Sequence, residues 1–110
     1  MTAVETVVLT QVHRASQEQI LRQLRRLKPR LLARYHATGL ALFGSVVRGE
    51  QTGASDIDLL VDFDDEASLL DLTGLALFLE DHLGLPVDIV PRRALRPEIR
   101  ETVLDEAVPV

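Results

Sequence analysis

The chain has 110 residues, of which 46% are hydrophobic, and it carries a formal net charge of −5. This length and composition predict one globular domain and exclude an extended disordered protein. The acidic balance argues against stable binding to DNA, because a duplex-binding protein normally presents a basic surface.

The sequence contains no cysteine, which excludes disulfides and metal sites built from thiolates. The first residues lack the basic and apolar segments of a signal peptide. No apolar run approaches the roughly 20 residues that span a bilayer. We therefore expect a cytoplasmic protein that makes no membrane contact.

Residues 1–15 show no clear periodicity and predict an N-terminal arm, so the folded domain is expected over residues 16–110. Ser16, with a glutamine three residues later, fits a capping box at the start of a helix. Apolar residues then recur at helical spacing: Ile20, Leu24, Leu27 and Leu31. Pro29 interrupts this pattern, which predicts that the first helix ends near residue 27 and that a second begins with the proline in its first turn.

Two short apolar segments, residues 40–43 and 56–63, predict the first two strands. The polar connection over residues 45–55 is too short for an ordinary parallel crossover that contains a full helix. We therefore expect the two strands to be antiparallel neighbours, with a turn of helix in the connection.

Three further elements are predicted along the chain. Ser68, with an aspartate three residues later, begins a leucine-rich helix that we expect to be largely covered and to end at Gly84. Residues 86–90 predict a third strand, and residues 94–107 a helix with four apolar residues spaced for one face: Leu95, Ile99, Val103 and Leu104. This order predicts an α+β (mixed α/β) fold in which helices cover a small sheet of about three or four strands.

Two carboxylates stand at the start of the second predicted strand. Asp56 and Asp58 are two residues apart, so in a strand their side chains share one face. Adjacent carboxylates repel each other unless a cation lies between them. Magnesium is usually held by one or two carboxylates together with substrate phosphates. The pair therefore predicts half of a site for a metal-bound nucleotide.

Asp88 interrupts the third apolar strand in the same way. If that strand pairs beside the second, the three carboxylates can hold one or two divalent ions, and two such ions can activate a phosphoryl transfer. The alternative role for Asp88 is a strand-end carboxylate that caps a nearby backbone N–H group.

The segment after the first strand predicts a cradle for a triphosphate. Gly44 has no Cβ and lets backbone N–H groups approach a ligand closely. Ser45 adds a hydroxyl donor, and Arg48 presents a guanidinium group that can fork onto phosphate. The structural alternative is a glycine-rich strand exit followed by a surface arginine.

Together these positions resemble the motif of the minimal nucleotidyltransferases of the polymerase-β-like superfamily, with ten residues between Gly-Ser and the first aspartate. The resemblance covers about residues 30–105. It implies that the glycine, serine and arginine hold the phosphates of ATP, that the three aspartates bind magnesium as two ions, and that the third aspartate helps to deprotonate the acceptor. The positions that carry it are Gly44, Ser45, Arg48, Asp56, Asp58 and Asp88.

The chain also resembles the antitoxin half of HEPN–MNT toxin–antitoxin pairs. This resemblance implies that it transfers AMP from ATP to a hydroxyl, expected to be a tyrosine, of a HEPN ribonuclease toxin. Two alternatives stay open: a non-catalytic antitoxin that neutralises the toxin by stoichiometric binding, and a nucleotidyltransferase that acts on a small molecule. The sequence also leaves open the nucleotide preference and whether the protein forms a homodimer or a hetero-oligomer with the toxin.

Overall fold

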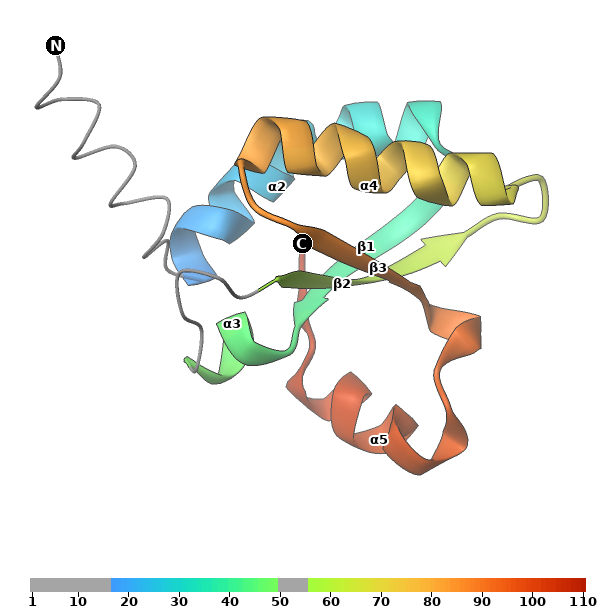
Figure 1. Cartoon of the computed structure of the whole chain (residues 1–110). Helices are drawn as coiled ribbons and strands as arrows, with labels where there is room; N and C mark the ends of the chain where they lie inside the picture. Colours follow the sequence, from blue (N-terminus) through green and yellow to red (C-terminus); the bar gives the residue numbers. More distant parts are fainter. Residues whose placement is uncertain (1–16, 50–55) are drawn as a thin grey trace, which may run out of the picture.

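The computed structural model describes residues 17–49 and 56–110, and it shows a four-stranded sheet with helices on both faces (Figure 1). The expected N-terminal arm and the Ser16 cap lie outside the described residues. The α+β fold expected from the sequence is confirmed. The elements along the chain are α2 (Gln17–Arg34), β1 (Ala37–Phe43), α3 (Ser45–Arg48), β2 (Ile57–Phe63), α4 (Leu69–Leu83), β3 (Val87–Pro91), the 3-10 turn η1 (Arg92–Ala94), α5 (Pro97–Glu106) and β4 (Val108–Pro109).

The strands follow the order β3-β2-β1-β4 across the sheet. Strands β1 and β2 are antiparallel neighbours, as expected, and α3 is the turn of helix expected between them. Strand β3 runs parallel to β2 on its other side, and α4 makes the connection. Strand β4 pairs antiparallel with β1 over two residues. No sequence signal marked it, because two residues are too few to show an alternating pattern.

Alternation along β2 divides the core between the two faces of the sheet. Ile57, Leu59 and Val61 are fully buried in the larger core, to which α2 and α4 also contribute. Leu60 points to the opposite face and packs in a smaller cluster with Val103 of α5. Figure 1 shows α2 and α4 on one side of the sheet and α5 on the other. The even-numbered residues of β2 therefore belong to the face that α5 covers only in part.

The expected break at Pro29 is wrong, because α2 continues from Gln17 to Arg34 with the proline inside it. An interior proline costs a helix about 3 kcal/mol. On the two sides of Pro29, Leu27 and Leu31 are both buried against the sheet. Each buried leucine contributes roughly 1.5–3 kcal/mol. The free energy gained by burying both leucines on one continuous helix therefore outweighs the cost of the interior proline.

Helix α4 has the predicted ends but not the predicted burial. Ser68 and Asp71 form the capping box, and Gly84 ends the helix in a left-handed conformation with φ 72°. However, Leu69 and Leu70 are 76% and 83% exposed, while the buried leucines lie one turn apart on a single side: Leu75, Leu79 and Leu83. The helix covers the sheet with one stripe and leaves its outer apolar residues in solvent.

Helix α5 begins later than expected, at Pro97 instead of residue 94. Proline at the first helical position fixes the start, and it holds the preceding Arg96 in an extended conformation. Only part of the expected apolar face is buried, since Ile99 and Leu104 are exposed. Among the helices in the described ranges, none is long and apolar enough to cross a membrane.

Candidate active site

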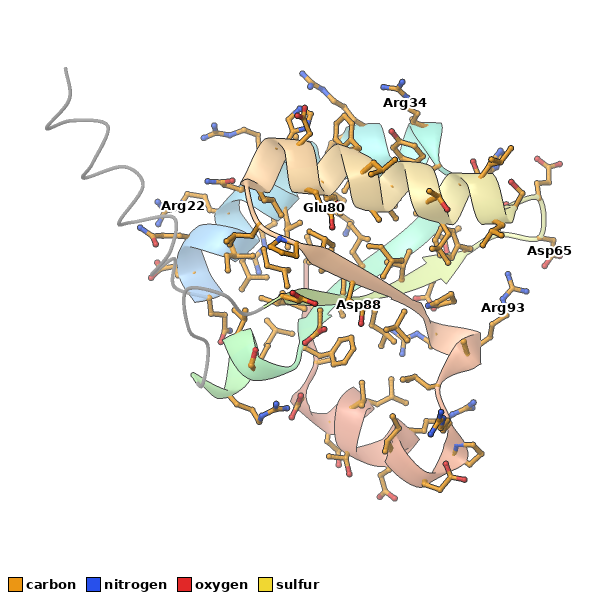
Figure 2. All side chains as sticks on the ribbon, viewed as in Figure 1. Arg22, Arg34, Asp65, Glu80, Asp88 and Arg93 are labelled. Atoms are coloured by element: carbon orange, nitrogen blue, oxygen red, sulfur yellow. The ribbon has the colours of Figure 1, made fainter. Side chains whose placement is uncertain are left out.

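Strands β2 and β3 bring two of the predicted carboxylates together. In their parallel register Asp58 lies opposite Asp88. Both side chains are on the face of the sheet that carries α5, since their neighbours in each strand point into the larger core. Figure 2 labels Asp88 on β3. Asp56 lies one residue before β2 and is exposed.

The charge around Asp58 is what a cation site requires. Partial burial raises the pKa of Asp58 most, and the negative charges of Asp88 and Asp56 raise this pKa further. The Arg48 guanidinium acts in the opposite direction, but the net shift is upward. The folded protein therefore holds Asp58 where its ionised form is disfavoured, and a bound cation would relieve this.

Gly44 connects β1 to this cluster. Phe43, the last residue of β1, lies opposite Asp58. Gly44 has φ 83° and ψ −152°, a combination that is open almost only to glycine. A Cβ atom built on it would lie 2.1 Å from the Asp58 Oδ2 atom. The backbone therefore passes Asp58 so closely that only glycine fits, which explains the glycine of the Gly-Ser motif.

Helix α3 follows at once and carries the other predicted phosphate ligands. The Gly44 carbonyl accepts a hydrogen bond from the Arg48 N–H group at 3.1 Å, which closes the single turn. Ser45 begins the helix, and Gly49 ends it in a left-handed conformation with φ 72°. The predicted serine and arginine are thus both held next to Gly44.

A residue that the sequence reasoning missed completes this corner of the site. The Gly44 N–H group donates to the Glu106 Oε1 atom at 2.9 Å, and Arg48 Nη1 donates to the same oxygen at 3.0 Å. Glu106 is the last residue of α5. No local motif marks it, because it reaches the site from a distant part of the chain.

The predicted metal ligands form an open set. Within residues 17–49 and 56–110, no three His, Cys, Asp or Glu side chains are grouped closely enough to hold a metal ion. The donors still fit magnesium, because they are carboxylate oxygens on, or one residue before, two adjacent strands. The charges of Asp88 and Asp56 also help to raise the pKa of Asp58. Metal binding by Asp56, Asp58 and Asp88 stays a prediction.

Asp62 has a different partner, although it shares a face with Asp58. The Arg92 Nε atom donates to Asp62 Oδ1 at 2.7 Å. This ion pair neutralises Asp62 at the far end of β2. Among the described residues, no such ion pair is formed by Asp58 or Asp88, which lie at the end of the strands next to Gly44.

Comparisons with known proteins identify the family of the chain. Residues 18–110 match the sequence family described as "Nucleotidyltransferase domain". This match extends beyond the span of about 30–105 expected from the motif. "Protein adenylyltransferase MntA" of Thermococcus cleftensis is 44% identical over 81 residues, which are 74% of this chain and 82% of that protein.

Solved structures show the same fold. A structure described as a minimal nucleotidyltransferase is 49% identical, with a TM-score of 0.72, and the match covers 82% of this chain and 92% of the other. A toxin–antitoxin structure with AMP-PNP is 27% identical, with a TM-score of 0.63, over 76% and 69% of the two chains. A structure of a tri-AMPylated Shewanella oneidensis HEPN toxin in complex with an MNT antitoxin contains a chain that is 26% identical, with a TM-score of 0.56, and the match covers 79% of this chain and 69% of the other.

The fold and the family match define a nucleotidyltransferase enzyme. The chain belongs to the minimal nucleotidyltransferase family.

Proposed function

We propose that this chain is a magnesium-dependent protein adenylyltransferase. It transfers AMP from ATP to a tyrosine hydroxyl of a HEPN-type toxin, and it thereby acts as the antitoxin in the cytoplasm. The observation that carries the proposal is the register of Asp58 with Asp88 beside the Gly44 backbone. The adenylyltransferase name of a 44% identical relative and the AMPylated toxin bound to a similar antitoxin support the choice of nucleotide and partner.

The phosphates of ATP bind on the β1 side of the site in this proposal. The Gly44 N–H group, the Ser45 hydroxyl and the Arg48 guanidinium are the donors, and all three belong to one turn. Asp56, Asp58 and Asp88 hold the magnesium ions. When bound, these ions polarise the α-phosphate and stabilise the negative charge that develops on the pyrophosphate.

The acceptor hydroxyl approaches from the β3 side. Asp88 is exposed and belongs to the strand on the other side of β2 from Gly44, so its carboxylate is accessible to a partner protein. The hydroxyl oxygen bonds to the α-phosphorus as the bond to the bridging oxygen of the β-phosphate breaks. The hydroxyl proton passes to Asp88, and pyrophosphate leaves.

The test is a transfer assay with α-labelled ATP, magnesium and a purified HEPN-type toxin from the same source as this chain. Wild type should label the HEPN protein, and Asp58→Asn should not. Asp65→Asn removes the same charge at an exposed turn far from the site and should label normally. Absence of label with every nucleoside triphosphate would refute the proposal. If Asp58→Asn still neutralised the toxin in cells, the stoichiometric alternative would replace it.

A further inference from the structure

Glu106 holds the two donors that the proposed function assigns to phosphate. One carboxylate oxygen, Oε1, accepts both the Gly44 N–H group at 2.9 Å and the Arg48 guanidinium at 3.0 Å. The Glu106 side chain is only 21% exposed. A backbone N–H group next to a guanidinium is also a typical arrangement for binding a phosphate oxygen. The carboxylate therefore uses the contacts that an incoming triphosphate needs.

The position of Glu106 follows from the fold around it. Helix α5 ends at Glu106, and the Ala107 N–H group completes its last turn by donating to the Val103 carbonyl at 2.9 Å. The chain then joins the sheet immediately, where Val108 of β4 pairs with Leu42 of β1. The backbone is thus held on both sides. A glutamate side chain has three rotatable bonds, so its carboxylate can leave the donors while the backbone stays in place.

Glu106 also adds negative charge where the nucleotide must arrive. Its charge contributes to the upward shift in the pKa of Asp58, which places it within electrostatic range of the predicted metal ligands. A triphosphate that enters the site displaces a carboxylate from its hydrogen bonds and also approaches that carboxylate's charge. Both effects oppose binding.

We propose that Glu106 is a built-in competitor of the triphosphate: it occupies the phosphate donors in the nucleotide-free enzyme and must be displaced when ATP binds. Glu106 thereby sets the affinity for nucleotide. The inference rests on the proposed function, because it requires Gly44 and Arg48 to bind phosphate.

The test is calorimetric titration of the full chain with AMP-PNP and magnesium. Glu106→Gln should bind AMP-PNP about tenfold more tightly than wild type, a factor that corresponds to about 1.4 kcal/mol. Asp105→Asn is the matched control, because it removes the same charge from an exposed neighbouring position. Its affinity should equal that of wild type, since the interaction of an exposed charge with groups more than about 8 Å away is largely screened at physiological salt.

A second variant separates the contact from the charge. Glu106→Asp keeps the charge but withdraws the carboxylate from both donors, so it should also bind more tightly than wild type. Equal or weaker binding by Glu106→Gln, in a variant whose thermal unfolding matches wild type, would overturn the inference and make Glu106 a support for Arg48. Equal tightening in Asp105→Asn would also overturn it. Failure of every variant to bind AMP-PNP would refute the proposed function itself.

Discussion

Replacing Gly44 by alanine tests whether the backbone passes Asp58 so closely that only glycine fits. Alanine would have to adopt φ 83° and ψ −152°, and its Cβ would lie 2.1 Å from the Asp58 Oδ2 atom. Side-chain contacts shorter than 3.0 Å are essentially never seen at a Cβ atom, so Asp58 or the backbone must move by about 1 Å. The substitution therefore perturbs both the conformation of the chain and the position of the carboxylate.

The expected size of both effects follows from these values. A disallowed backbone conformation together with a displaced rotamer should lower the free energy of unfolding by about 2–4 kcal/mol. In a domain of this size, each 1 kcal/mol lowers the melting temperature by about 4–8 °C. A displacement of about 1 Å in a group that positions the substrate can reduce the rate about 100-fold. Thermal unfolding and the labelled-ATP transfer assay measure the two effects.

Gly49→Ala is the matched control, because Gly49 has φ 72° but a Cβ atom there would contact none of the described residues within 4 Å. It should lower stability by only about 1 kcal/mol and leave transfer nearly unchanged. The loss of stability caused by Gly44→Ala should also be smaller in a chain in which Asp58 is replaced by alanine, since the carboxylate oxygen that collides with the new Cβ atom is then absent. Equal activity of the Gly44→Ala and Gly49→Ala variants would refute the close approach of Gly44 to Asp58.

Two predictions concern ionisation. A hydrogen bond to Asp64 raises the pKa of His36 above 6.5. The stabilisation from this pair should therefore be complete below pH 6.5 and lost as the pH rises through the raised pKa. An NMR titration in which Asp64→Asn leaves the pKa of His36 unchanged would contradict this. Burial and neighbouring carboxylates raise the pKa of Asp58, so its ionised form destabilises the fold once the pH exceeds that pKa. Asp58→Asn should therefore raise the melting temperature at pH 7 in metal-free buffer and leave it unchanged below pH 3.8. A lower melting temperature of this variant at pH 7 would show that the neighbouring carboxylates do not repel Asp58 there.

The sequence could predict the site where its residues are close together along the chain or lie on regular elements. The alternation of Asp58 with buried residues identified its strand and face, and the same pattern around Asp88 suggested a neighbouring strand. The register that sets the two opposite each other depends on the parallel pairing of β2 with β3. That pairing depends on the tertiary structure. The sequence could therefore predict that Asp58 and Asp88 meet only if the two strands were assumed to be neighbours.

The features that sequence reasoning got wrong or missed depend on packing between distant segments. Pro29 is a local helix breaker, and only the burial of leucines on both sides of it keeps α2 continuous. Glu106 gives no local signal, since its partners Gly44 and Arg48 lie 62 and 58 residues away. Its role becomes visible only once α5 folds back against the face that carries Asp58.

The order of the strands has a consequence for how two reactants can meet. Gly44 follows β1 and Asp88 lies on β3, with Asp58 on the strand between them. In the proposed reaction, donor and acceptor would therefore enter from opposite flanks, and neither blocks the path of the other. Such a layout favours a single direct displacement within a ternary complex, without a covalent enzyme intermediate. This displacement would invert the configuration at phosphorus.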